Sequence, residues 1–228
     1  MQQIRAILFD KDGTLFDFQA TWGAWARGFL ASETGGDAAL ARRLAEAMDY
    51  DIEGGRFRPE SAVIAGTGRE VAEILAPLLS RDVDALERHI AVTAAQAPLV
   101  EAAPLAPLLA RLRAAGLRLG VATNDFEAVA HRHVASVHDQ FDFIAGFDSG
   151  HGAKPGPGML LAFARSCGLA PHQVLMVGDS RHDLMAGRAA GMSTLAVLTG
   201  VACADDLADL ADAVRPDIGH LPELLGLD

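Results

Sequence analysis

Two carboxylates follow an apolar run near the start of the chain. Residues 7–9 are Ile-Leu-Phe, and Asp10 and Asp12 come directly after them. Such a run predicts a buried parallel strand, and open α/β sheets place their ligands at the carboxyl ends of these strands. Side chains two residues apart on an extended segment point the same way, so Asp10 and Asp12 are expected to share one site while Lys11 faces elsewhere.

This pair of acids suggests a particular chemistry. Adjacent carboxylates repel each other, so a protein keeps them where a cation binds between them or where one holds a proton. One acid can then act as a nucleophile and the other as a general acid/base, with Mg²⁺ neutralising the pair. A strand end followed by an Asx-type turn uses the same residue types, so the pair alone leaves both interpretations open.

Further polar groups follow other predicted strands. Thr123 and Asn124 end one strand, and Asp179 and Asp183 follow another. Because parallel strands end at one edge of a sheet, these groups are expected to gather there with the first pair of acids. Lys154 lies between them in the chain, in a proline-containing loop that holds the backbone rigid.

The elements that must position these groups alternate regularly after Pro104. The pattern predicts helices over 105–115, 126–136 and 157–167, a further helix after 183, and strands over 117–123, 141–147, 173–179 and 193–199. With the first strand this makes five strands joined by helices. The sequence therefore predicts an α/β fold with a doubly wound, parallel, Rossmann-like sheet and right-handed crossovers.

Residues 18–99 have a different texture. Apolar residues recur at helical spacing, turn signals divide the segment into about four helices, and no strand is predicted. We therefore expect a core made of residues 1–17 and 100–228, with an inserted all-helical domain over 18–99. Trp22 and Trp25 lie on one helix face and are expected to pack in its interior.

Composition excludes several classes of protein. The formal net charge is −11 with no cluster of Lys and Arg, which argues against a nucleic-acid or anionic-membrane partner. No apolar run approaches the roughly 20 residues of a membrane span. The first residues lead directly into the first strand with no signal sequence, and the two cysteines suit no disulfide scaffold, so a cytoplasmic location is expected. His131, His133 and His138 are expected to form a solvated face.

The four motifs together resemble those of the haloacid dehalogenase superfamily of phosphatases. They are Asp10-Lys11-Asp12-Gly13-Thr14, Thr123-Asn124, Lys154-Pro155 and Gly178-Asp179 with Asp183 four residues later. The helical segment after the first motif resembles the mobile cap of the phosphoglycolate phosphatase-like branch.

This resemblance implies a role for each motif residue. Asp10 would attack phosphorus to form an aspartyl-phosphate, and Asp12 would act as general acid and then general base. Mg²⁺ would be bound by Asp10, the Asp12 carbonyl and Asp179, while Asp183 would hold waters or neighbouring groups around the ion. Thr123 and the Asn124 backbone would bind the phosphoryl group, and Lys154 would compensate its charge.

The resemblance favours a Mg²⁺-dependent phosphatase acting on a small phosphomonoester, either phosphoglycolate-like or a sugar phosphate. A phosphomutase of the β-phosphoglucomutase type would use the same Asp10 phosphoenzyme, and a non-catalytic binding protein is a third alternative. The partner is then a small phosphorylated metabolite, and the chain is expected to be a monomer or homodimer.

The loop over 54–58 is the candidate for binding the part of the substrate beyond its phosphoryl group. Its glycines permit close approach, and the guanidinium groups of Arg56 and Arg58 can bind a carboxylate or a second anionic group. The alternative is that both arginines are ordinary solvated loop residues.

Overall fold

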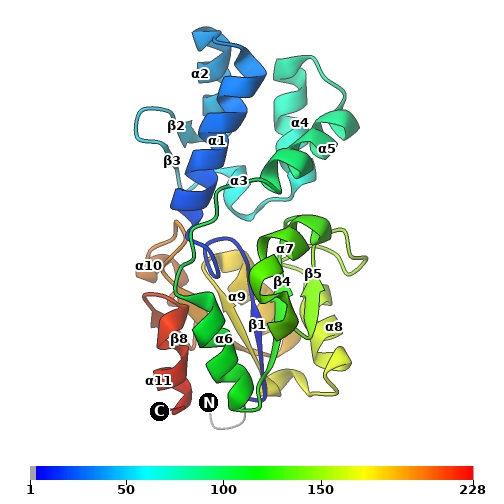
Figure 1. The fold of residues 1–228 in the computed structure, drawn as a ribbon, viewed down its shortest axis with the longest axis vertical. Helices are drawn as coiled ribbons and strands as arrows, with labels where there is room; N and C mark the ends of the chain where they lie inside the picture. The colour runs from blue at the N-terminus through cyan, green and yellow to red at the C-terminus, as the bar shows by residue number, and fades with distance from the viewer. Residues whose placement is uncertain (1–3, 228) are drawn as a thin grey trace.

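The computed structural model describes residues 4–227, and its centre is a six-stranded parallel sheet (Figure 1). The strand order is β5-β4-β1-β6-β7-β8, and every neighbouring pair is parallel. The strands are β1 (Ala6–Phe9), β4 (Arg118–Ala122), β5 (Phe143–Ala145), β6 (Val174–Gly178), β7 (Ser193–Val197) and β8 (Ala213–Arg215). The first strand in the chain, β1, lies inside the sheet between β4 and β6, so the groups that follow it are flanked on both sides.

Helices cover both faces of the sheet because the buried strands are apolar on both faces. In β1, Ile7 and Phe9 pack with α6 and the carboxyl-terminal elements, whereas Ala6 and Leu8 pack with α8 and α9. These helices are α6 (Leu105–Ala114), α7 (Glu127–His133), α8 (Gly158–Ser166), α9 (Arg181–Ala190), α10 (Ala204–Leu207) and α11 (Leu221–Leu225), with 3₁₀ turns η1 (Ala135–Gln140), η2 (Pro171–Gln173) and η3 (Ile218–His220). The doubly wound α/β fold expected from the sequence is confirmed.

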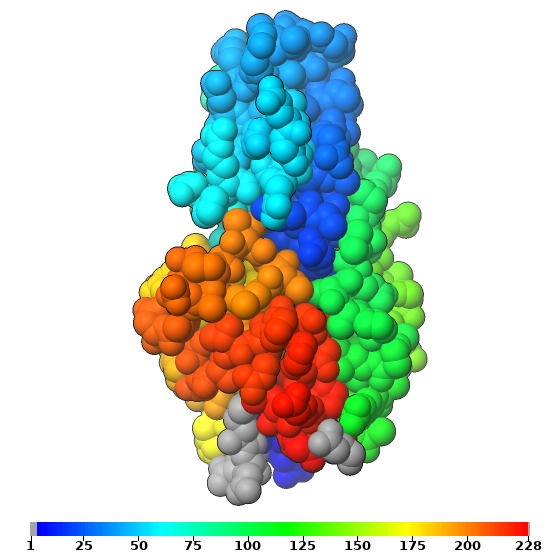
Figure 2. Space-filling view, turned by 90° about the vertical axis from the view of Figure 1, so that its left-hand side faces the viewer, coloured from blue at the N-terminus to red at the C-terminus, as the bar shows by residue number. Residues whose placement is uncertain are grey.

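The segment between β1 and α6 stands above the carboxyl edge of the sheet (Figure 1) and forms a separate lobe in the space-filling view (Figure 2). Its elements are α1 (Phe18–Thr34), α2 (Ala38–Ala47), β2 (Tyr50–Asp51), β3 (Arg56–Phe57), α3 (Ala62–Ala65), α4 (Gly68–Leu79) and α5 (Val83–Ala94). These elements share a hydrophobic cluster that includes Trp22, Trp25, Leu44 and Leu75, and Val129 of α7 joins it from the sheet side. We call residues 18–99 the helical segment.

Both connections to the helical segment run side by side. Asp17 N–H donates to Val100 O at 2.8 Å, and Ala102 N–H donates to Leu15 O at 2.9 Å. The Asp17 carboxylate also caps α1 by accepting from Ala20 N–H. The segment therefore leaves and rejoins the core at one point, beside the end of β1.

The structure differs from the expected elements in three places. The sheet has a sixth strand, β8, whose three residues are only half-buried and give no apolar run. The helical segment has five helices and includes a short antiparallel pair, β2 with β3, where no strand was predicted. The helix expected over 126–136 ends at His133 and continues as a 3₁₀ turn.

Residues 1–3 and 228 of the predicted core lie outside the described residues. Within residues 4–227, no helix combines the length and the apolar character that a membrane crossing requires.

We predict opposite stability effects for two glycine substitutions. A Cβ atom at Gly120, in β4, would lie 2.8 Å from the ring of Phe163 and 3.0 Å from Leu8, so Gly120→Ala should destabilise the protein by about 1–3 kcal/mol. Gly28 in α1 is exposed with open space around its Cβ position, so Gly28→Ala should stabilise by about 0.5–1 kcal/mol. Urea unfolding of both variants measures the difference, and equal midpoints would contradict the packing described for β4.

Candidate active site

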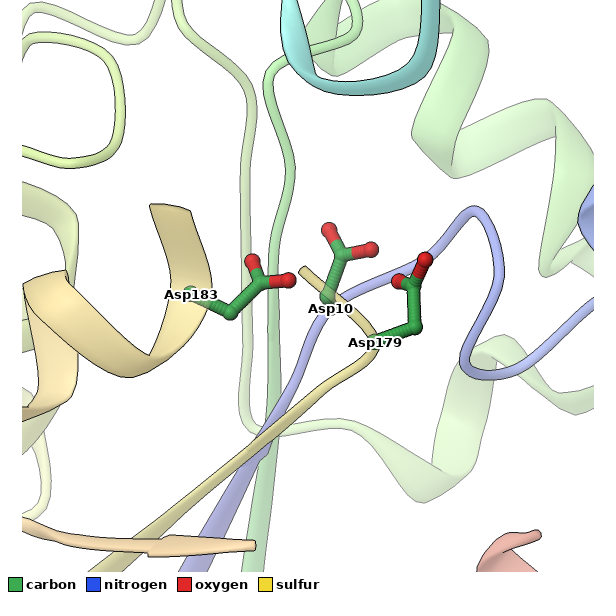
Figure 3. Close-up of side chains that lie close together, drawn as sticks. All are labelled: Asp10, Asp179 and Asp183. Atoms are coloured by element: carbon green, nitrogen blue, oxygen red, sulfur yellow. The ribbon is translucent and has the colours of Figure 1, made fainter. Parts of the chain in front are cut away.

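The carboxylates of Asp10, Asp179 and Asp183 converge at the carboxyl edge of the sheet (Figure 3). Asp10 follows β1, Asp179 follows β6, and Asp183 lies in the first turn of α9. All three are buried, and one oxygen from each lies within 4.8 Å of the others. The arrangement results from neighbouring strands β1 and β6 ending together.

Backbone geometry around Asp179 leaves no room for other side chains. Gly13 has a φ of +86°, and a Cβ there would lie 2.3 Å from Asp179 Oδ2. A Cβ at Gly200 would lie 1.8 Å from the same oxygen. The loop after Asp10 is also tied to the far side of the site, since Thr199 Oγ1 donates to Gly13 O at 2.7 Å.

A capping interaction orients Asp183. Its Oδ2 accepts from Ser180 N–H at 3.0 Å and from Ser180 Oγ at 2.7 Å, which completes a capping box at the start of α9. Its other oxygen, Oδ1, lies 2.5 Å from Lys154 Nζ. Asp183 therefore caps the start of α9 and also supplies negative charge to the site.

Lys154 is the cation between two of these acids. Its Nζ lies 2.5 Å from Asp10 Oδ1 as well as from Asp183 Oδ1, and its side chain is buried. Asn124 fixes its backbone, because Asn124 Oδ1 accepts from Lys154 N–H at 2.8 Å and Asn124 Nδ2 donates to Lys154 O at 2.9 Å. Burial lowers the pKa of Lys154, but the two carboxylates more than offset this and raise it above its ordinary value.

One ammonium does not balance three buried carboxylates. Burial raises the pKa of Asp10 to about 7, and Asp183 and Asp12 add to the rise while Lys154 opposes it. Burial, Asp183 and Asp10 likewise hold the pKa of Asp179 well above its ordinary value. Three oxygen donors with excess negative charge fit a hard divalent cation such as Mg²⁺, which would lower both pKa values.

Asp12 is held by a second buried lysine. Lys11 Nζ lies 2.7 Å from Asp12 Oδ1 and 3.1 Å from Asp125 Oδ2, and it is 5.6 Å from the centre of the Trp22 ring. The side chain of Lys11 is fully buried. The sequence predicts that Lys11 faces away from the site shared by Asp10 and Asp12, whereas its ammonium contacts Asp12 itself.

His133 completes this network, and its expected place on a solvated face is wrong. It is 4% exposed, its Nδ1 lies 3.0 Å from Lys11 Nζ, and its Nε2 lies 2.9 Å from Ala94 O in the helical segment. Since an ammonium can only donate, Nδ1 accepts and Nε2 carries the proton that is donated to Ala94 O. Burial lowers the pKa of His133 to about 4, and Lys11 adds to the effect. Lys11 and His133 are 122 positions apart, and no spacing in the sequence relates them.

A cavity lies between these acids and the helical segment. Its floor includes Asp10, Asp12, Thr123 and Lys154, and its other wall comes from α1, α3, α4 and α5. Thr123 is buried at the end of β4, and its hydroxyl accepts from Asp125 N–H at 3.1 Å. The sequence-predicted motif residues are therefore brought to one cavity.

The two arginines expected to read the substrate lie elsewhere. Arg56 and Arg58 are exposed on the β2–β3 hairpin, and neither is among the residues that line the cavity. Instead, residues 63–68 line it, and Asn124 Nδ2 donates to Ala65 O at 2.8 Å. Arg181 pairs with Asp209 at 2.6 Å on the surface.

The chain matches a family model described as haloacid dehalogenase-like hydrolase over residues 4–191. A phosphoglycolate phosphatase of Neisseria meningitidis is 30% identical over 243 residues, which cover 98% of this chain and 93% of the relative. A phosphoglycolate phosphatase of Xanthomonas campestris is 32% identical over 204 residues, covering 89% of this chain and 86% of the relative.

Solved structures show the same fold over the whole chain. A HAD phosphatase from Thermococcus onnurineus has a TM-score of 0.68 at 21% identity, with 99% of each chain covered. A HAD family hydrolase from Deinococcus radiodurans, solved with bound phosphate and sodium, has a TM-score of 0.67 at 23% identity and covers 100% of this chain and 98% of its own.

The raised pKa of Asp10 predicts a pH-dependent stability. Between its ordinary pKa of 3.8 and about 7, the folded protein without metal binds a proton that the unfolded chain has lost. The free energy of unfolding therefore falls as pH rises through this window. Asp10→Asn keeps the shape but does not titrate, so the variant should gain about 1–4 kcal/mol relative to the unmodified protein between pH 5 and pH 8.

Urea unfolding in excess chelator at several pH values measures this gain, and the difference between the two proteins cancels the titration of His133. Saturating Mg²⁺ should remove most of the pH dependence from the unmodified protein. Parallel stability curves for the two proteins would show that Asp10 does not carry the raised pKa.

Proposed function

Because this chain belongs to the haloacid dehalogenase-like hydrolase family, we propose that it is a Mg²⁺-dependent phosphatase of small phosphomonoesters. The observation that carries the proposal is the meeting of Asp10, Asp179, Asp183 and Lys154 in one cavity, with Asp12 two residues after Asp10. The relatives named phosphoglycolate phosphatase support the same class of reaction.

In this proposal Asp10 is the nucleophile. Its carboxylate attacks phosphorus, the bond to the leaving oxygen breaks, and an aspartyl-phosphate forms. The contact of Lys154 Nζ with Asp10 Oδ1 at 2.5 Å holds that carboxylate still and offsets the charge of the incoming phosphoryl group. Thr123 and the Asn124 backbone line the same cavity and would bind the phosphoryl oxygens.

Asp12 is the proposed general acid/base. It gives a proton to the leaving alkoxide and later takes one from the water that hydrolyses the aspartyl-phosphate. Lys11 positions it, because the ammonium reaches both Asp12 oxygens, at 2.7 and 2.6 Å, and is itself held by Asp125 and His133. Contacts within the protein, and not water molecules, therefore keep the Asp12 carboxylate in place beside the cavity.

Mg²⁺ would be held by Asp10, the Asp12 carbonyl and Asp179, with Asp183 nearby, and would supply electrophilic stabilisation of phosphoryl charge. We further propose that residues 18–99 act as a cap that excludes water. The contacts from Asn124 to Ala65 and from His133 to Ala94 support this, since each joins the sheet side to the cap side beside the cavity.

Phosphate release from a panel of phosphomonoesters, with Mg²⁺ and in excess chelator, tests the proposal. Release should require Mg²⁺, and Asp10→Asn should lower it by at least about 10³-fold, because an amide cannot form the phosphoenzyme. Arg42→Ala, an exposed change on α2, is the control. Phosphoryl transfer to a sugar phosphate without free phosphate would indicate a mutase, and no turnover of any ester would indicate a binding protein.

A second experiment separates the role of Asp12. Asp12→Asn should lower kcat/KM for an alkyl phosphate at least about 10²-fold more than for 4-nitrophenyl phosphate, whose leaving group needs no proton. The constant kcat/KM reports formation of the phosphoenzyme, so the later hydrolysis step does not obscure the comparison. Equal losses on both esters would remove Asp12 from the general-acid role.

A further inference from the structure

The wall that the cap contributes to the cavity is largely apolar, and its one buried side-chain donor without a partner in the described chain is the indole N–H of Trp22. It includes the indole rings of Trp22 and Trp25, which meet edge to face at 5.3 Å, and the side chains of Ile64, Val71 and Ile90. Thr67 has the only hydroxyl among the cap residues that line the cavity. That hydroxyl already accepts from Glu70 N–H at 3.2 Å and donates to Glu70 Oε2 at 3.0 Å.

The same wall carries no charged group. The helical segment contains eight arginines and no lysine, and none of these arginines lines the cavity in the described chain. Arg69 in α4 and Arg81 just after that helix are both paired with acids, since Arg69 lies 2.5 Å from Asp84 and Arg81 lies 2.8 Å from Glu33. A carboxylate on the leaving group would therefore meet no cation on the cap side.

The basic side chains on the sheet side of the cavity are paired with carboxylates or belong to the sheet-side helices. Lys154 is shared by Asp10 and Asp183, and Lys11 is fully buried among its own partners. His182, the one imidazole lining the cavity in residues 4–227, belongs to α9 and is next to Asp183. Both lysines therefore already have carboxylate partners, and His182 comes from the sheet side of the cavity.

An acidic groove adjoins the cavity. This wider groove shares Ile64 and His182 with the cavity and is lined by Glu60, Glu73 and Asp206. Its arginine, Arg181, is paired with Asp209 through two contacts of 2.6 and 2.9 Å. An anionic leaving group would thus be repelled beside this groove and desolvated in the cavity without a cation on the cap side.

We infer that the substrate of this site is a phosphomonoester of an uncharged, largely apolar alcohol or phenol, and that a carboxylated substrate such as phosphoglycolate is disfavoured. This inference rests on the proposed function, since it assigns the leaving group to the cap side of the cavity. The phosphoryl group binds to the sheet side, and the leaving group packs against Trp22, Trp25 and Ile64.

Matched esters test the inference on the unmodified protein with Mg²⁺. Phenyl phosphate and 3-carboxyphenyl phosphate release phenols of similar acidity, so they differ mainly in the added charge; propyl phosphate and phosphoglycolate form an aliphatic pair. The neutral member of each pair should have the higher kcat/KM, by at least about 30-fold, because the carboxylate is buried without a cation to compensate its charge. Equal or higher kcat/KM for the carboxylated members would overturn the inference.

Ile64 offers the corresponding variant because it is half-buried and lines both the cavity and the groove. Ile64→Lys should lower the preference for the neutral ester at least about tenfold by supplying the missing cation. Ile64→Gln controls for lost apolar surface, and Val92→Lys, at a position 59% exposed on α5, controls for added charge on the cap. A preference that Val92→Lys lowers as much as Ile64→Lys would also overturn the inference.

Failure of the inference and failure of the proposed function give different results. If phosphoglycolate is hydrolysed at least as well as propyl phosphate, the phosphatase assignment stands and the apolar substrate class falls. If no ester of either pair releases phosphate with Mg²⁺, the phosphatase assignment itself falls and the substrate class falls with it.

Discussion

Repulsion among buried carboxylates is the constraint on which this structure depends. Asp10, Asp179 and Asp183 meet because β1 and β6 are neighbours and α9 begins directly beyond β6. Lys154 compensates part of that charge, and its own place depends on Asn124 at the end of β4. The fold thus assembles, from three strand ends, a site whose buried negative charge Lys154 compensates only in part.

The helical segment is coupled to this charge balance through few contacts. Lys11 compensates the charges of Asp12 and Asp125 and lies beside the Trp22 ring. His133 contacts Lys11 through one ring nitrogen and Ala94 of the helical segment through the other. Asn124 touches both Lys154 and Ala65. Displacement of the helical segment would therefore disturb groups that hold Asp12 and Lys154, which links the position of this segment to the arrangement of the acids.

The sequence was informative where a local pattern decides the structure. An apolar run followed by Asp10, Thr123 or Asp179 predicts a strand end, and parallel strands bring such ends together. The hairpin of β2 and β3 has no such pattern, because each strand has two residues and Gln19 of α1 holds Phe57 through two hydrogen bonds of 2.9 Å. The contact of Lys11 with His133 is likewise tertiary, so periodicity in the sequence does not predict it.

The sequence has two lysines, Lys11 and Lys154, and both are buried beside the motif carboxylates, at 0% and 4% exposure. All other basic charge outside histidine is carried by arginine. The described surface therefore offers no side-chain primary amine to an acylating reagent, and acetylation of lysine has no exposed target in this arrangement of the chain. The rate at which a reagent labels these two amines would therefore measure how often the buried site becomes exposed to solvent.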